Sequence, residues 1–345
     1  MVNQAAWLTG PKEKPLKVDS APDAKPGPGE VVIQNAAVAI NPVDWKIQDL
    51  GLFLTEYPSL LGSDSAGTIY EVGPGVTHLK KGDRVIAHTS FLLAFNTANA
   101  SFQSHPLAPA NVVSPIPSSL PFTQAAVLPL AISTATHGLY GQLGLPLPPA
   151  SASEASKPGS AGTLVVWGGS TSVGSVGIQL AVASGLYVIS TASQRNFEFV
   201  RSLGAKAIAD YNSGIVVADV VRKVKEIGGQ FKGVYNAFGG DTTELCTEIV
   251  EQLGGGVVAS VTPGEEGKST QAAEVKSIMA PITAKDERLA TGIWGNFVPA
   301  ALADGRLKAK PDAIIIKGGL GKIQEGLDTL KQGISAGKIV VDLES

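Results

Sequence analysis

The stretch that decides the fold lies in the middle of the chain, at residues 163–174, with the sequence Thr163-Leu-Val-Val-Trp-Gly168-Gly-Ser-Thr-Ser-Val-Gly174. An apolar run leads into a turn of glycines and hydroxyl residues, and residues 172–184 then carry apolar side chains at helical spacing. A strand that runs through such a turn into a helix leaves the first backbone N–H groups of the helix free for a pyrophosphate. The stretch therefore predicts a dinucleotide-binding turn.

The predicted turn departs from the usual glycine pattern. The predicted cofactor contacts come from Gly168, Gly169, Ser170, Thr171, Ser172 and Val173. Counted from Gly169, Thr171 replaces the second glycine of G-x-G-x-x-G, whereas Gly174 occupies the third position. The alternative is a helix that is only capped by a hydroxyl residue and packed through Gly174. The alternation that follows favours the dinucleotide interpretation.

Strands and helices alternate on the C-terminal side of this turn. The predicted strands cover residues 186–191, 207–210, 233–237 and 257–261, and the predicted helices cover residues 172–184, 196–203, 215–227 and 242–253. Glycines follow the last three helices, at Gly204, Gly228 and Gly254. This alternation is typical of an α/β fold with a doubly wound parallel sheet.

The flanking segments have a different pattern. Predicted strands at residues 30–37, 67–72 and 84–87 are separated by Gly- and Pro-containing turns and, without any helix–strand alternation, indicate a β-rich domain. Residues 123–143 have helical spacing, and residues 145–161 are rich in Pro, Ala and Ser, which predicts a surface loop.

The C-terminal segment returns to strands. Predicted strands at residues 313–316 and 338–343 enclose a predicted helix at residues 322–334. From their pattern alone, these strands could join the first domain or extend the parallel sheet.

The end of the second strand of the alternation indicates which nucleotide binds. NAD-specific sites place an acidic residue there, but residues 186–196 contain no Asp or Glu. Ser193 and Arg195, followed by Asn196, instead suit a ribose 2′-phosphate, because an always-charged guanidinium binds phosphate strongly. We therefore expect NADPH. The alternative for Arg195 is a solvated residue at a helix start.

Composition excludes several classes of protein. The chain has 345 residues, a length typical of two domains, and a formal net charge of −3, which gives no support for nucleic-acid binding. Its single cysteine, Cys246, excludes a disulfide framework and cysteine-rich zinc sites. Since the first residues do not resemble a signal peptide and no apolar run is long enough to span a membrane, we expect a cytoplasmic protein without a membrane partner.

Several further motifs are similar to those of one enzyme superfamily. They are Asn41-Pro-Val-Asp-Trp-Lys46, Leu61-Gly-Ser-Asp-Ser-Ala-Gly67, Lys81-Gly-Asp-Arg-Val85, the glycine turn followed by Gln179-Leu-Ala181, and Gly337-Lys-Ile-Val-Val341. In this order they resemble the medium-chain dehydrogenase/reductases over essentially the whole chain. The similarity is greatest to fungal zinc-binding-oxidoreductase-like proteins, which include quinone-oxidoreductase-like members and trans-acting enoyl reductases of polyketide pathways.

The resemblance implies two domains. A GroES-like, β-rich catalytic domain would comprise residues 1–125 and 300–345. A Rossmann NADPH-binding domain would comprise residues 126–299, inserted between the two parts of the first. The Ser/Thr-rich phosphate turn is also similar to that of the fungal members.

The resemblance raises the question of zinc, which many members of the superfamily bind. Where zinc members have Gly-His-Glu, this chain has Gly62-Ser63-Asp64, and no cysteine precedes Cys246. The four histidines are scattered without ligand spacing, so surface or hydrogen-bonded histidines are expected, and no metal. Without a Lewis acid to stabilise an alkoxide, conjugate reduction of an activated C=C bond becomes the expected reaction.

In such a reduction, an enolate develops on the carbonyl oxygen and a proton must reach the α-carbon. The resemblance implies that Pro42 and Lys46 lie beside the nicotinamide, with Lys46 as the first candidate donor. Thr134 lies in a segment similar to one that lines the family's cleft, and Tyr57 could donate the proton. The alternatives are a solvated lysine, a helix hydroxyl bonded to its own backbone and a loop aromatic. Asp44 is expected to anchor Lys46 or the local backbone.

Two aromatic residues complete the predicted cofactor contacts. Tyr211 could pack beside the adenine or be a packing residue at the rim. Trp294 could lie near the carboxamide or belong to the core.

The leading hypothesis is an NADPH-dependent, metal-free reductase of an enone, enal or enoyl thioester. An NADPH quinone oxidoreductase shares the cofactor site and is the alternative enzyme. A crystallin-like protein that binds NADPH without turnover is an alternative of another class. The expected partners are a small α,β-unsaturated carbonyl compound or quinone and, for an enoyl reductase, a polyketide synthase. The chain itself is expected to be a monomer or homodimer.

Overall fold

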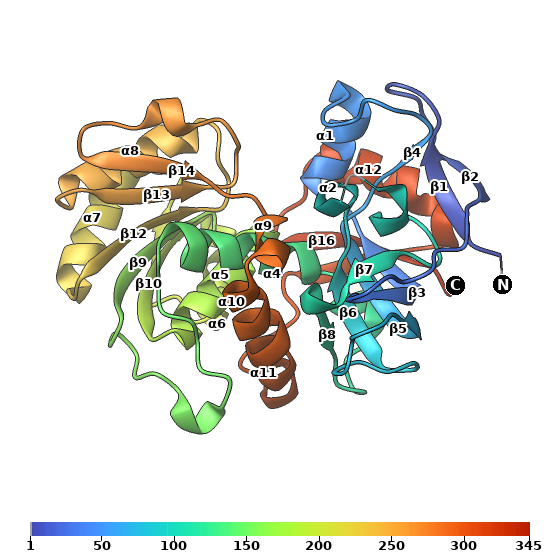
Figure 1. The fold of residues 1–345 in the computed structure, drawn as a ribbon. Coiled ribbons are helices and arrows are strands. Elements are labelled where there is room, and N and C mark those ends of the chain that lie inside the picture. The colour runs from blue at the N-terminus through green and yellow to red at the C-terminus, as the bar shows by residue number, and fades with distance from the viewer. Residues whose placement is uncertain (1, 95) are drawn as a thin grey trace. The chain divides into compact units, whose positions relative to one another are not determined.

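The computed structural model describes residues 2–94 and 96–345, which form two compact units (Figure 1). The first unit runs to Leu130 and resumes at Asp312, and the second comprises Ala131–Pro311. The sequence-based boundary between residues 299 and 300 would divide helix α11 (Val298–Asp304). The helix lies whole within the second unit, and its Val298 and Ala301 are both buried.

A parallel sheet forms the centre of the second unit, with its strands in the order β11-β10-β9-β12-β13-β14. The strands are β9 (Gly162–Trp167), β10 (Leu186–Ala192), β11 (Ala207–Asp210), β12 (Phe231–Asn236), β13 (Gly256–Ser260) and β14 (Ala273–Ser277). The order runs outward from β9 in one direction and outward from β12 in the other, which is the arrangement of a doubly wound sheet. The predicted α/β fold is confirmed.

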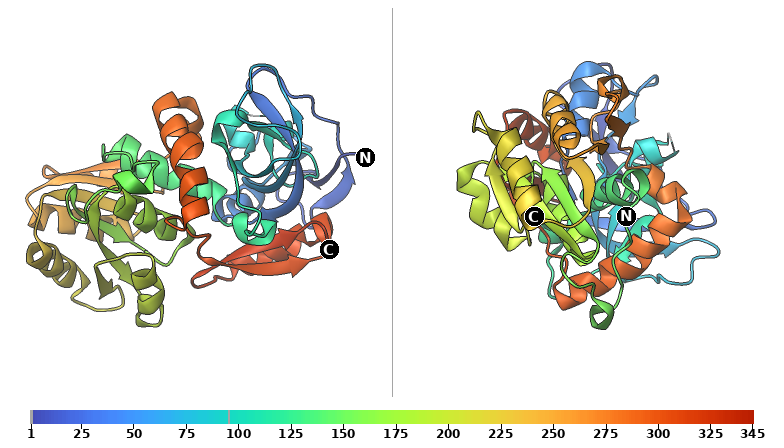
Figure 2. Two further views of the ribbon diagram at one scale, coloured as in Figure 1. Left: turned by 90° about the horizontal axis from the view of Figure 1, so that it is seen from below. Right: turned by 90° about the vertical axis from the view of Figure 1, so that its left-hand side faces the viewer.

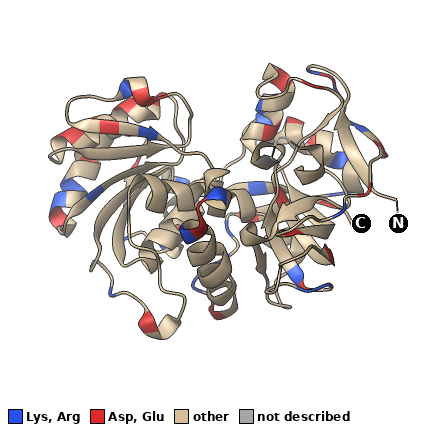
Figure 3. Ribbon diagram, in the orientation of Figure 1, with Lys and Arg blue, Asp and Glu red and all other residues tan. Residues whose placement is uncertain are grey.

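Helices cover both faces of this sheet. They are α4 (Pro129–Thr136), whose first two residues belong to the other unit, α5 (Ser172–Ala183), α6 (Phe197–Ser202), α7 (Val216–Ile227), α8 (Thr242–Gln252), α9 (Ile282–Lys285), α10 (Glu287–Leu289) and α11, with π-helical segments at His137–Gln142 and Ala290–Phe297. Helix α7 buries Val220 and Val224 against the sheet, while its outer face pairs Lys223 with Asp219 (Figure 3). Within the described ranges, no helix combines the length and the apolar character needed to cross a membrane.

Two features of this unit differ from the predictions. The helical pattern over residues 123–143 is broken, because α3 (Phe122–Ala125) ends before Pro129 and a new helix begins at that proline. Proline lacks an N–H and is accepted at a helix start but not inside a helix. Strand β14 was not predicted; it pairs in parallel with β13, with Val275 opposite Val258.

The first unit is rich in strands, as predicted. One sheet has the order β15-β16-β3-β5-β6-β8, with β7 paired to β3, and another has the order β2-β1-β4. The strands are β1 (Gln4–Leu8), β2 (Lys17–Ser20), β3 (Glu30–Ala39), β4 (Ser59–Leu60), β5 (Asp64–Val72), β6 (Arg84–His88), β7 (Leu107–Pro109), β8 (Val113–Pro115), β15 (Asp312–Lys317) and β16 (Gly337–Asp342). Since Val340 of β16 lies opposite Ala39 of β3, the C-terminal strands join this unit and do not extend the parallel sheet (Figure 2).

Helices also occur in the first unit, and the first two of them were not predicted from the sequence. They are α1 (Pro42–Leu50), α2 (Phe91–Ala94), α3 and α12 (Ile323–Lys331). The start of α1 is fixed by Pro42 in its first turn and by the Asp44 side chain, which accepts the N–H of Asn41 at 2.7 Å. Its end is fixed by Gly51 in the left-handed conformation (φ 70°).

Candidate active site

The turn after β9 is built on glycines that the backbone requires. Gly168 has a φ of 80°, which side chains rarely adopt. A Cβ on Gly169 would lie 2.1 Å from the Ser190 Oγ, and a Cβ on Gly174 would lie 2.2 Å from the Gly168 carbonyl oxygen. The turn and the first turn of α5 are therefore packed so closely that only glycine fits at these positions.

Thr171 explains why the turn tolerates a side chain where the usual pattern has glycine. Its hydroxyl donates to the Gly168 carbonyl at 2.8 Å and accepts the N–H of Gly174 at 3.0 Å. Thr171 is thus the N-cap of α5, and its side chain faces the turn itself. The capping alternative and the dinucleotide interpretation are therefore compatible at this residue.

The first turn of α5 offers donors that fit a phosphate. Ser172 and Val173 occupy the first two helical positions, whose N–H groups have no partner within a helix. The Ser172 Oγ is buried, and in the part of the chain described here it has no hydrogen-bond partner. An orphaned hydroxyl next to free N–H groups at a helix N-terminus suits the pyrophosphate of a dinucleotide.

The end of β10 holds this turn in place and carries the residues expected at the 2′-phosphate. Thr191 accepts the Gly168 N–H at its Oγ1 and the Gly169 N–H at its carbonyl, both at 2.9 Å. Asn196 Nδ2 donates to the Ser193 Oγ at 3.2 Å and to the Ser170 Oγ at 3.4 Å. Asn196 therefore links the phosphate turn to the loop after β10.

Two other predicted residues of this region are open to solvent. Arg195 is exposed in the 3₁₀ turn Gln194–Asn196. Tyr211 follows β11 and is 43% exposed, with its backbone N–H 3.4 Å from the Ala192 carbonyl oxygen. Both side chains are free to contact a ligand at the carboxyl edge of the sheet.

A buried acidic residue at the same edge was missed by the sequence analysis. The register places Trp167, Asn236 and Ser260 in one row at the carboxyl ends of β9, β12 and β13. The buried Glu265 carboxylate accepts hydrogen bonds from the Ser260 and Thr243 hydroxyls, each at 2.6 Å. No sequence signal marks Glu265, because its hydrogen-bond partners Thr243 and Ser260 come from two different segments.

The Glu265 group is extended by two neighbours. Asn236 donates from Nδ2 to the Thr243 Oγ1 at 3.0 Å and accepts the Gly239 N–H at 3.0 Å. Lys268 lies 3.4 Å from Glu265 and donates to the Gly240 carbonyl at 2.9 Å. The loops after β12 and β13 are therefore joined by one polar network.

The second unit also contains Thr134 and Trp294. Thr134 lies in α4 and is buried, with 8% of its surface exposed. Trp294 is fully buried in its π-helical segment, and its Nε1 donates to the Ser133 Oγ at 3.2 Å. The burial of Trp294 favours the core alternative over a contact with the cofactor.

The remaining predicted residues lie in the first unit. Pro42 and Lys46 are exposed on α1, and the Lys46 Nζ lies 5.8 Å from the centre of the Trp45 ring. Tyr57 is half-buried in the loop after α1, against the core formed by α1 and α12. Asp44 is completely buried and caps the backbone of Asn41, so it anchors the backbone and not Lys46.

A buried charged cluster lies beside α1 and was also missed. The Lys338 Nζ is 3.1 Å from the Asp64 Oδ2 and donates to the Asn41 Oδ1. Asn41 Nδ2 donates to Asp64 Oδ2 at 2.6 Å, and the other Asp64 oxygen accepts the Leu130 N–H at 2.6 Å. Burial, with a smaller contribution from the charge of Asp64, raises the pKa of Asp44 from 3.8 to about 7.

Two of the four histidines are placed as expected, and the other two are not. His78 is exposed and bonds the Ala110 carbonyl, and His137 accepts the Met279 N–H at 3.0 Å. His88 and His105 are buried, and neither ring has a hydrogen-bond partner among the described residues. Burial lowers the pKa of His88 to about 4. Across residues 2–94 and 96–345, no three His, Cys, Asp or Glu side chains gather as a metal site.

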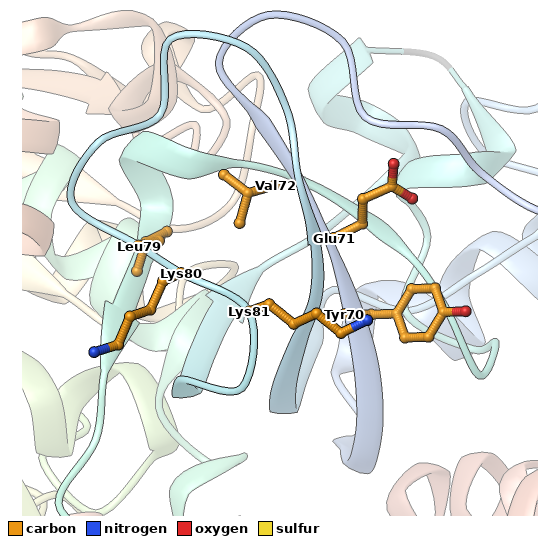
Figure 4. A pocket seen from close by; sticks show the side chains of 6 residues that line it. All are labelled: Tyr70, Glu71, Val72, Leu79, Lys80 and Lys81. Atoms are coloured by element: carbon orange, nitrogen blue, oxygen red, sulfur yellow. The ribbon is translucent and has the colours of Figure 1, made fainter.

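An open groove lies elsewhere in the first unit. Lys80, Lys81, Glu71 and Tyr70 line it, together with Val72 and Leu79 (Figure 4). Tyr70 is six residues after Asp64 in β5, which corresponds to roughly 20 Å along a strand. This groove is therefore separate from the cluster beside α1.

Comparison with known proteins identifies the family. Residues 27–118 match the profile of the alcohol dehydrogenase GroES-like domain. The chain is 42% identical over 346 residues to a trans-enoyl reductase of Aspergillus japonicus, with 99% of this chain and 98% of the relative covered. The chain is a medium-chain dehydrogenase/reductase.

Other relatives agree with this assignment. This medium-chain dehydrogenase/reductase is 38% identical over 354 residues to a dehydrogenase of Emericella nidulans, with 99% of both chains covered. A solved alcohol dehydrogenase superfamily protein from Novosphingobium aromaticivorans matches it with a TM-score of 0.77 at 26% identity, over 99% of both chains. The chain is thus an oxidoreductase, of a family whose enoyl and quinone reductases bind a nicotinamide cofactor. The predicted family is confirmed.

Proposed function

We propose that this medium-chain dehydrogenase/reductase uses NADPH to reduce an activated C=C bond in an enone, enal or enoyl thioester. The segment after β10 supports NADPH over NADH, because it contains Ser193 and Arg195 and no acidic residue. A hydroxyl donor beside a permanent cation favours a 2′-phosphate over a 2′-hydroxyl.

The phosphate turn supports the same proposal. The N–H groups of Ser172 and Val173 and the orphaned Ser172 hydroxyl would bind the pyrophosphate. Asn196, bonded to both Ser170 and Ser193, would keep the two phosphate-binding segments in register. When bound, NADPH supplies the hydride that adds to the β-carbon.

Three side chains of this protein are assigned to the rest of the reaction. The exposed Lys46 ammonium would donate to the carbonyl oxygen on which the enolate develops. The Thr134 hydroxyl would be a second donor, to that oxygen or to the cofactor amide. The phenol of Tyr57 would deliver the proton to the α-carbon.

The substrate class follows from the relatives. The protein from Aspergillus japonicus is a trans-enoyl reductase. For the present chain we propose an enoyl thioester, presented by a polyketide synthase, as the favoured substrate. Catalysis is proposed to need no zinc, since serine and aspartate stand at the positions Ser63 and Asp64, where zinc members have His and Glu.

The cofactor assignment is tested with Arg195→Ala. Removing one charge-assisted contact, worth about 1.5–3 kcal/mol, should weaken NADPH binding by roughly 10- to 150-fold. NADH binding should stay within about twofold, since it has no 2′-phosphate. Fluorescence titration of both nucleotides measures this, with Arg201→Ala on the exposed face of α6 as the matched control. Equal losses for the two nucleotides would refute the 2′-phosphate assignment.

The reaction is tested with a panel of enones, enals, quinones and an enoyl-loaded synthase. We expect NADPH oxidation with alkenes conjugated to a carbonyl. Turnover of quinones alone would replace the proposal with the quinone reductase, and tight NADPH binding without oxidation of any acceptor would support the non-catalytic protein. Stoichiometric zinc in the purified protein would overturn the metal-free mechanism.

The role of Lys46 is tested separately. Lys46→Ala should lower kcat by about 100-fold, the effect of losing one donor to a developing oxyanion, without changing NADPH affinity. Lys80→Ala, an exposed lysine of the same unit, is the control. An unchanged kcat would remove Lys46 from the mechanism.

A further inference from the structure

Four neighbouring strands bring chain-distant polar residues into one row beside the start of α1. Asp64, the first residue of β5, lies opposite Ala39 of β3 and opposite His88 of β6. On the other side of β3, the Ile40 N–H donates to the Ile339 carbonyl of β16 at 3.0 Å. Lys338 therefore enters the row from nearly 300 residues after Asn41 in the sequence.

Several hydrogen bonds surround one ion pair in this row. Asp64 receives three donors: Lys338 at 3.1 Å, and the Asn41 amide and the Leu130 N–H at 2.6 Å each. The side chains of Lys338 and Asp64 are 4% and 0% exposed. Asn41 also accepts a hydrogen bond from Lys338, so the amide is held at both ends.

Burying this ion pair carries a desolvation penalty that apolar side chains in the same space would not have. Charges removed from water lose favourable solvation, and a protein with apolar residues of equal volume in their place is often as stable or more stable. Apolar side chains in this place could not orient neighbouring polar groups through hydrogen bonds. Here the pair fixes Asn41, which is the N-cap of α1, and the Leu130 N–H in the first turn of α4.

We propose that Lys338 is a positioning residue that sets the active geometry of α1 through Asn41 and Asp64. The inference rests on the proposed function, because Lys46 on α1 is there assigned to the carbonyl oxygen. Lys338 itself is buried and contacts no substrate. Its ammonium orients the Asn41 amide, Asn41 fixes the first turn of α1, and that turn sets where Pro42 and Lys46 lie.

The test uses two variants so that a folding failure is recognised. Lys338→Met leaves the Asp64 carboxylate buried without its cation and is expected to destabilise the protein strongly. The double variant Lys338→Met/Asp64→Asn removes both charges and is expected to fold. Its matched control is Lys322→Met/Glu325→Gln, which neutralises an exposed ion pair of the same unit.

The double variant should lose at least tenfold in kcat, while its NADPH dissociation constant stays within twofold because the phosphate turn belongs to the other unit. Hydrogen exchange should become faster at the backbone amides of residues 41–50 and remain unchanged in residues 168–184. The control should behave as the unmodified protein. Assays at a temperature where all variants are fully folded separate positioning from stability.

The outcomes distinguish this inference from the proposed function. A double variant with unchanged kcat, or with unchanged exchange in α1, overturns the role of Lys338. A kcat loss that disappears wherever the variant is fully folded also overturns it, since the role would then be structural. If the unmodified protein reduces no alkene, the proposed function fails, and the exchange of α1 still shows whether Lys338 positions that helix.

Discussion

The hydroxyl of Thr243 donates to the buried carboxylate of Glu265 at 2.6 Å, and this bond joins the start of α8 to the loop after β13. Ser260 donates to the same carboxylate at 2.6 Å. A carboxylate accepts both donors at full strength, whereas an amide oxygen accepts them more weakly and brings an NH₂ group that must find a partner of its own.

Glu265→Gln should therefore lower the melting temperature by several degrees and weaken NADPH binding. Hydrogen bonds to a charged acceptor contribute about 1.5–3 kcal/mol each, and 1 kcal/mol corresponds to roughly 2–4 °C in a protein of this size class. Differential scanning fluorimetry and nucleotide titration measure both effects. Glu251→Gln, on the exposed side of α8, is the control. Equal melting temperatures for the two variants would show that the hydrogen bonds of Glu265 do not stabilise the protein.

Gly174→Ala should abolish cofactor binding. The added Cβ would lie 2.2 Å from the Gly168 carbonyl oxygen, so the phosphate turn would have to move away from α5. Gly214→Ala is the matched control, since nothing lies within 4 Å of its added Cβ and its φ is not in the left-handed region. Nucleotide titration of both variants is the measurement, and full NADPH affinity in Gly174→Ala would show that the turn is not the phosphate site.

Thr171→Ala should destabilise the protein by about 1 kcal/mol, the usual effect of losing an N-cap side chain. Thr171→Ser keeps the hydroxyl that donates to Gly168 and accepts from Gly174. Its stability and NADPH affinity should therefore equal those of the unmodified protein. Urea unfolding and nucleotide titration provide the comparison. If the serine variant were as impaired as the alanine variant, the threonine methyl and not the cap would matter.

The pH dependence of stability contains two opposing contributions beside α1. Burial raises the pKa of Asp44 from 3.8 to about 7, so the folded state binds the extra proton between these values and stability falls as pH rises. Burial lowers the pKa of His88 from 6.5 to about 4, so the unfolded state binds the extra proton there and stability rises with pH. Between about pH 4 and pH 6.5 the two slopes offset each other.

His88→Gln should remove the histidine contribution to the pH dependence of stability and leave that of Asp44. Relative to the unmodified protein, its free energy of unfolding should fall by about 1.4 kcal/mol per pH unit between pH 4.5 and pH 6. Urea unfolding across this range measures the difference. Parallel curves for His88→Gln and the unmodified protein would contradict the assignment.

The parallel-sheet unit could be predicted because its signals are local. The apolar run of β9, the glycine turn and the helical spacing of α5 lie within some twenty consecutive residues, and each reports on its own backbone. Strand β14 was not predicted because the loop before it is long and rich in glycine and charged residues. Within the strand, Val275 alone gives little alternation of apolar and polar residues.

The polar groups beside the predicted site could not be found in this way. Helix α1 lacks the usual apolar stripe because Asp44 and Gln48 are among its buried residues. Only Pro42 at its start and Gly51 after its last residue mark it as a helix. The closing motif contains Lys338, but its meaning depends on Asn41 and Asp64, whose proximity follows from strand order. Side-chain networks of this kind depend on contacts between segments that are distant in the sequence.

The position of β16 at the end of the sequence suggests an order in which the two units fold. This strand is synthesised after the whole of the parallel-sheet unit, and it carries the only cation that contacts the Asp64 carboxylate among the described residues. Before β16 has left the ribosome, a closed first unit would hold that carboxylate without a counter-charge, so we expect this unit to stay open until then. The second unit, contiguous in sequence, can become compact earlier. We therefore expect the inserted half to be completed first during synthesis and the half that surrounds it in sequence to close last.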